Sequence, residues 1–224
     1  MDKLEPSGLY DELGEVSRYR PLLQGDIFSG VDLPELGPEP YLVQVVAHPC
    51  AMRKGHDLLS HITVAPVAKS GPVGSWNGSL RIMPLPSLVD GDHYATQFVS
   101  VTAARADKLR IEKRIASLSH RGIYVLQQRL IKHYTRLEVG LVELHKRSAP
   151  TLEEASLQFD WVETCLRAVQ APSGAQINAA IKSFDDWLRQ GSPSPQELLK
   201  EEVNFVDVRR AARIAVGKLG SRPR

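Results

Sequence analysis

The pattern of hydrophobic and polar residues divides the chain into a strand-rich first half and a helical second half. Two apolar, β-branched runs at residues 42–47 and 62–67 are bounded by proline and glycine and predict two buried strands. Shorter runs predict strands at 24–28, at 79–85, where Pro84 and Pro86 are expected to end the strand, and at 94–102. Short strands separated by turn residues in this way predict a small antiparallel β-barrel.

From residue 103 onward the hydrophobic period becomes that of a helix. Ser119 predicts an N-cap, and a helix after it would pack one apolar stripe against an open side of the barrel. The residues of that stripe are Ile123, Leu126, Leu130, Tyr134 and Leu137.

Three more amphipathic helices are expected towards the C-terminus. The first would begin at a capping box formed by Thr151 and Glu154, the second covers residues 177–188, and the third would begin at Ser194 with Pro195 in its first turn. The expected organisation is an N-terminal arm at 1–20, the barrel with its closing helix at 21–147, and a helical region at 148–224.

Composition is that of an ordinary globular protein, with 42% hydrophobic and 24% charged residues. The net charge of +2 is too small to indicate a nucleic-acid partner by itself. Cys50 and Cys165 are far apart, the N-terminus is acidic, and no apolar run approaches eighteen residues. We therefore expect a reduced, cytoplasmic protein without membrane contact, metal site or cofactor.

Basic residues are concentrated around the predicted helix after Ser119. They are Arg105, Lys108, Arg110, Lys113, Arg114, Arg121, Arg129, Lys132 and Arg136. A solvated helix face and a nucleic-acid surface explain this concentration equally well. On the second interpretation, nucleic-acid contacts are expected from Lys54, Lys69, Arg81, Arg121, Arg129 and Lys132.

The insert between the two buried strands carries the candidate catalytic groups. RNA cleavage by in-line attack of a 2′-hydroxyl needs an acid, a base and cations for the phosphate. His48 and His56 titrate near neutrality, and Arg53 can hold a phosphate by two hydrogen bonds. Cys50, close to these cations, is either a reactive thiolate or a small apolar residue at the strand end. Trp76 and Asn77 could stack a base, or Trp76 could cover the barrel core.

Several short motifs resemble the PemK/MazF-like toxins. Gln24-Gly25-Asp26-Ile27-Phe28, followed by Val31-Asp32, is similar to the opening strand of that family. Later resemblances occur at Val45-Val46-Ala47-His48-Pro49, Thr63-Val64-Ala65-Pro66-Val67, Phe98-Val99-Ser100-Val101 and Leu118-Ser119, so the likeness covers residues 23–134. It implies an SH3-like barrel, usually dimeric, in a family of which many members cut single-stranded RNA.

The catalytic positions of that family are not matched. Its arginine would fall at Leu42 and its hydroxyl pair near Ala68 and Lys69, while residues 141–224 have no counterpart in the single-domain toxins. Two functions are therefore expected as alternatives. One is a toxin-like or defence-associated protein that interacts with single-stranded RNA or another nucleic acid and acts as a metal-independent endoribonuclease. The other is an inactive barrel that binds a protein partner through its C-terminal helices, and in either case a homodimer is conceivable.

Overall fold

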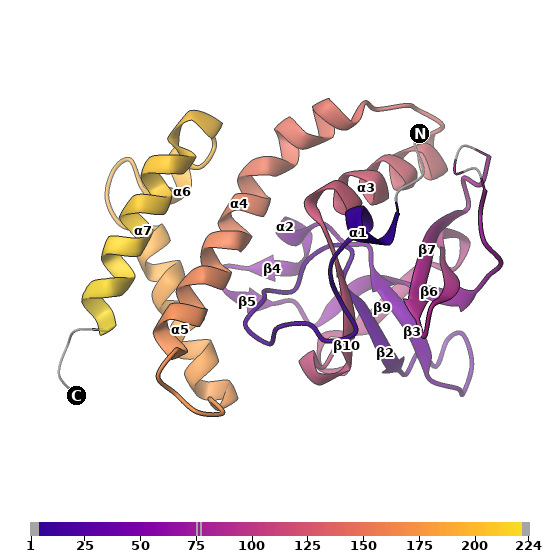
Figure 1. Cartoon of the computed structure of the whole chain (residues 1–224), viewed down its shortest axis with the longest axis horizontal. Helices are drawn as coiled ribbons and strands as arrows, with labels where there is room; N and C mark the ends of the chain where they lie inside the picture. Colours follow the sequence, from indigo (N-terminus) through magenta and orange to yellow (C-terminus); the bar gives the residue numbers. More distant parts are fainter. Residues whose placement is uncertain (1–4, 75, 77, 221–224) are drawn as a thin grey trace. The chain divides into compact units, whose positions relative to one another are not determined.

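The chain forms two compact units in a computed structural model that describes residues 5–74, 76 and 78–220 (Figure 1). The first unit contains the described residues up to 18 together with 22–145, and the second contains 19–21 and 146–220. The first unit is rich in strands and the second is helical, as the hydrophobic pattern predicts.

The first unit is a nearly closed antiparallel β-barrel followed by a helix. Its strands are β1 (Tyr10–Leu13), β2 (Ile27–Val31), β3 (Tyr41–Val45), β6 (His61–Lys69), β7 (Ile82–Val89), β8 (Asp92–Gln97), β9 (Thr102–Arg105) and β10 (Arg114–Leu118). They follow the order β1-β10-β2-β3-β6-β8-β7, and β9 also pairs with β6. The long strand β6 pairs with two strands on the same side. Its first half pairs with β9, and its last residues pair with β8.

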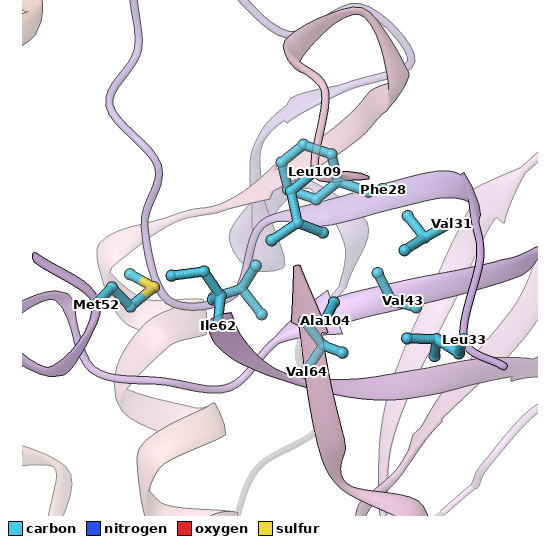
Figure 2. Packing of buried hydrophobic residues seen from close by; sticks show 10 residues of the cluster. Phe28, Val31, Leu33, Val43, Met52, Ile62, Val64, Ala104 and Leu109 are labelled. Carbon is cyan, nitrogen blue, oxygen red and sulfur yellow. The ribbon is translucent and has the colours of Figure 1, made fainter. Parts of the chain in front are cut away.

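Inward-facing residues of β2, β3 and β6 fill the barrel. Figure 2 shows side chains of this core converging from these strands, from β9 and from segments outside the sheet that carry Leu33, Met52 and Leu109. The buried members of the cluster are Phe28, Val31, Leu33, Val43, Val45, Met52, Ile62, Val64, Ala104 and Leu109. Met52 is the last residue of the short helix α2 (Pro49–Met52) and is 0% exposed, so it anchors the polar insert to the barrel core.

Strand β7 contains Pro84 and Pro86, which were expected to end it. β7 is the last strand in the sheet order, so one of its edges pairs with no other strand of the described chain. The two prolines are two residues apart and therefore point their nitrogens to the same edge of the strand. A missing N–H at an open edge costs no ladder hydrogen bond, which is why proline is tolerated there.

The N-terminal segment is part of the barrel and not an arm. After α1 (Pro6–Leu9), strand β1 pairs with β10, with Tyr10 opposite Leu118 and Leu13 opposite Ala116. Leu9 is fully buried. Strand β10 lies in the part of the chain after residue 103 for which helical periodicity was predicted. The hydrophobic pattern did not reveal it, because two of its residues are Arg114 and Ser117.

The closing helix α3 (His120–Thr135) begins after Ser119, as predicted. The Ser119 hydroxyl accepts a hydrogen bond from the Gly122 amide at 3.0 Å and donates one to the Gly8 carbonyl at 2.7 Å. This N-cap therefore also ties the start of α3 to α1. Gly122 allows a very close approach, because a Cβ atom there would lie 2.4 Å from the Leu9 carbonyl oxygen.

Replacing Gly122 by alanine should destabilise the protein, although alanine normally favours a helix by about 1 kcal/mol over glycine. The added methyl group would meet a backbone oxygen that cannot rotate away, so we expect the free energy of unfolding to fall by about 1–3 kcal/mol. Urea denaturation measures this change. The matched control is Gly217→Ala, where nothing lies within 4 Å of the new Cβ atom. A loss no larger than that of the control would contradict the close contact.

The second unit consists of α4 (Leu141–Leu166, of which residues 146–166 belong to this unit), α5 (Gly174–Leu188), α6 (Pro195–Leu198) and α7 (Phe205–Gly220). Its buried core is formed by Leu157, Trp161, Phe184, Leu188, Leu199, Val208, Ala212 and Val216. None of the described helices combines the length and the apolar character that a membrane crossing requires.

Two of the expected helix boundaries in this unit are wrong. α4 begins at Leu141, ten positions before the capping box expected at Thr151, and contains Pro150 in its interior. The third expected helix does start after Ser194, whose side chain accepts from the Glu197 amide in a capping box. It ends after one turn, and a 3₁₀ turn at Glu202–Asn204 separates it from α7.

Candidate functional site

The polar insert forms a β-hairpin that is separate from the barrel sheet. After α2, strand β4 (Arg53–Lys54) pairs with β5 (Asp57–Leu58), and Gly55 with φ +66° occupies the first position of the two-residue turn. A positive φ at this position is what a tight hairpin turn requires, and glycine adopts it without strain. Residues 54–61 are all exposed, so the hairpin is anchored at Met52 and open to solvent beyond it.

His48 caps helix α2. Its Nδ1 atom accepts a hydrogen bond from the Cys50 amide at 3.3 Å, and burial lowers the pKa of the imidazole. The neutral ring in this arrangement carries its proton on Nε2. With Nδ1 used by the cap and the proton on Nε2, the neutral ring has no free nitrogen to act as a general base, and its lowered pKa disfavours the imidazolium that a general acid needs.

The other expected catalytic residues lie on the same short segment. Arg53, at the base of the hairpin, donates from Nη2 to the Leu22 carbonyl at 3.2 Å. The Nε2 atom of His56, in the turn, is 3.3 Å from the Asp57 carboxylate. Cys50 is exposed and reduced. The catalytic roles of these residues remain predictions.

Two of the lysines expected to contact nucleic acid form ion pairs within the protein. Lys69 pairs with Asp92 and Lys132 pairs with Glu138. Lys54, Arg81 and Arg121 are exposed, and within the described part of the chain none of the three forms an ion pair. They lie on the hairpin, before β7 and at the start of α3.

Arg129 is buried, so its expected role as a phosphate ligand is wrong. It is 1% exposed, and burial lowers its pKa to about 10, which leaves it charged at neutral pH. Its Nε and Nη1 atoms donate to the carbonyls of Ile82 and Trp76, both at 2.8 Å, and Nη2 donates to that of Ser79. The guanidinium therefore holds the segment before β7 onto α3.

Trp76 belongs to the same arrangement. Its ring centroid is 5.9 Å from the Arg129 Cζ atom, and the residue is 2% exposed. With Lys132 and others, these two residues line a pocket of about 320 Å³. The covering role expected as one alternative for Trp76 fits this burial better than base stacking does, and Asn77 lies outside the described residues.

Exposed apolar side chains at the C-terminal end of α3 and in the 3₁₀ turn Phe98–Ser100 were missed by the periodicity argument. Tyr134 and Leu137, expected to face the core, are 61% and 64% exposed, as is Val99 at 64%. The two segments approach each other at His133, whose ring lies 5.6 Å from that of Phe98, the residue before Val99, and 4.7 Å from that of Tyr134.

Two arginines lie close to these residues along the backbone. The Arg81 carbonyl accepts from the Phe98 amide at 2.9 Å, so the Arg81 backbone lies next to the residue that precedes Val99, and Arg136, two positions after Tyr134, is the C-cap of α3. Both arginines are exposed and have no ion-pair partner among the described residues. We call Arg81, Val99, Tyr134, Arg136 and Leu137 the Tyr134 surface.

Comparisons with known proteins do not identify this arrangement. Models of known protein families give no match to the sequence, and a search of curated proteins finds none that is significantly similar. The resemblance to the PemK/MazF-like toxins therefore remains a prediction, and functional inference depends on the geometry of the chain itself.

Proposed function

We propose that the barrel unit binds single-stranded nucleic acid through the Tyr134 surface. The observation that carries the proposal is a set of exposed aromatic and aliphatic side chains close to two exposed arginines that have no carboxylate partner in the described structure. Proteins that bind single strands combine these two elements, because aromatic rings stack on unpaired bases and cations bind the phosphates. A duplex hides the faces of its bases, so the aromatic ring favours a single strand.

The hairpin provides a second source of positive charge on the same unit. Lys54 is exposed there, beside Arg53 and His56. The resemblance to PemK/MazF-like toxins supports an SH3-like barrel and makes RNA the first probe to test. The proposal concerns binding, since His48 is engaged as a helix cap and cleavage would require a base from elsewhere.

Replacing Tyr134 by alanine should weaken binding of a single strand by about tenfold, within the range measured for loss of one stacked base. Fluorescence anisotropy with labelled oligo-U, oligo-dT and a duplex of the same length, about twenty nucleotides, measures the effect. We expect both single strands to bind more tightly than the duplex. Equal affinity of Tyr134→Ala and the parent for oligo-U would contradict the proposal.

The arginines are tested by salt dependence. For single strands the slope of log K against log salt changes by about 0.7 per phosphate contact, so Arg81→Gln with Arg136→Gln should reduce it by about 1.4. Arg121→Gln is the matched control, an exposed arginine at the opposite end of α3 without an ion pair in the described structure. An equal loss from this control would show that binding is spread over the basic residues and not localised at the Tyr134 surface.

A further inference from the structure

A groove runs between helices α4 and α7 of the helical unit. Its volume is about 290 Å³, and all the residues that line it belong to this unit. Apolar side chains form its floor, among them Leu157 and Trp161 from α4 and Ala212 and Val216 from α7. The floor is therefore the edge of the core that holds the helices together.

The two sides of the groove differ in charge, because both of its carboxylates lie on the α4 side. Asp160 and Glu163 line it from α4, with Arg167 just beyond the end of that helix, and Arg209 and Arg213 line it from α7. Arg209 is held by two hydrogen bonds to the buried carboxylate of Glu153. Glu163 and Arg213, by contrast, form no ion pair with any described residue, although they face the same groove.

We infer that this groove is the contact surface for a second copy of the chain. A two-fold axis running along the groove places α4 of one copy over α7 of the other. Each Glu163 then lies on the same side of the interface as an Arg213 from the partner copy, and the pairing occurs twice. A two-fold axis across the groove would instead oppose like charges, so the charges select the first arrangement.

The same surface includes an exposed apolar side chain. Val206 is 63% exposed and lies three positions before Arg209 and seven before Arg213, on one row of α7. Contact with a second copy would remove it from water. The two carboxylates on the α4 side disfavour a nucleic acid as the occupant, whereas a surface that carries both signs side by side is complementary to itself.

Charge reversal on each wall tests the inference. The dissociation constant of the dimer, measured by analytical ultracentrifugation of the full chain, should rise at least about tenfold for Glu163→Arg and for Arg213→Glu, because like charges then meet twice. In the double variant the walls exchange signs and stay complementary, so the constant should return to within about threefold of the parent. Lys182→Glu, an equal charge reversal on the exposed side of α5, is the control and should have no effect.

Three outcomes would overturn the inference. The first is a parent protein that stays monomeric up to about 100 µM, a concentration at which a specific dimer of moderate affinity is formed. The second is a dimer that neither single variant weakens, which would place the interface elsewhere. The third is a double variant that is no better than the singles while its circular dichroism matches that of the parent. Nucleic-acid binding through the Tyr134 surface is measured separately and does not depend on any of these results.

Discussion

Replacing Arg114 by methionine is expected to lower the free energy of unfolding by about 3–5 kcal/mol, because it leaves the carboxylate of Asp26 buried without its cation. The side chains of these two residues are 1% and 0% exposed, and Nη1 of Arg114 donates to Oδ2 of Asp26 at 2.9 Å. An isolated charge in such a position is far more costly than the pair. This is one of the two largest effects that we expect from a single substitution.

The Asp26 carboxylate connects three segments of the barrel unit. Besides Arg114, it accepts hydrogen bonds from the Leu23 amide at 2.9 Å and from the Ser117 hydroxyl at 2.6 Å. Arg114 in turn donates from Nη2 to the Ser17 carbonyl at 2.9 Å. The network thus fixes the entry to β2, strand β10 and the N-terminal segment to one another.

A double-mutant cycle separates the energy of the Asp26–Arg114 interaction from the cost of burying each charged group. Asp26→Ala should be as destabilising as Arg114→Met, and the double variant should lose much less than the sum, because no unpaired charge remains. Urea unfolding gives the free energies, and hydrogen exchange shows whether the loss is confined to the barrel unit. If Arg114→Met stays within about 1 kcal/mol of the parent, the ion pair contributes little and the barrel is held by its apolar core.

The structure also explains why the sequence has Gly25 and Asp26 before β2. Gly25 and Asp26 open the segment that resembles the PemK/MazF-like toxins. Gly25 has φ +96°, and a Cβ atom there would lie 2.7 Å from the Leu118 side chain. Asp26 is the buried acceptor of the network. The fold therefore requires both residues, and their presence supports a prediction of the fold but not a prediction of catalysis.

Local signals in the sequence predicted the strands and helix starts that depend on nearby residues alone. Ser119 and Ser194 cap helices as expected, since a hydroxyl needs only the amide three residues later. Thr151 carries an equally good local signal, yet α4 passes through it and through Pro150. Strand β10 was not predicted, because its polar residues Arg114 and Ser117 are buried. Their hydrogen-bond partner is Asp26, which is about ninety residues away in sequence.

The candidate site shows the same limit. Helical periodicity assigns Tyr134 and Leu137 to the core and Arg129 to the solvent, and the structure reverses both assignments. The segment before β7 is bonded to Arg129 and His133 of α3, while Tyr134 and Leu137 stay exposed. Periodicity identifies which residues share a face, but which parts of that face are covered depends on segments about fifty residues distant.

The second large effect is expected for Arg129. Arg129→Met removes a charged group that donates to three carbonyls, and hydrogen bonds of this kind contribute about 1.5–3 kcal/mol each when a buried acceptor is left unsatisfied. Part of this lost free energy is recovered, because the segment before β7 can move away from α3 and expose its carbonyls to water. We therefore expect the free energy of unfolding to fall by about 2–4 kcal/mol, with faster amide exchange in residues 78–82.

Two further substitutions distinguish this structural role from the phosphate contact expected from the sequence. Lys132→Met, on the same helix, breaks an exposed pair with Glu138 and should change stability by less than about 1 kcal/mol. Arg129→Lys keeps the charge but cannot reach three carbonyls with one ammonium group, so it should lose most of what methionine loses. A phosphate ligand would behave in the opposite way: lysine would replace arginine well, methionine would reduce the salt dependence of binding, and stability would not change.

Since the guanidinium holds Leu80 and Arg81 against α3, loss of Arg129 should weaken nucleic-acid binding only to the extent that this segment opens.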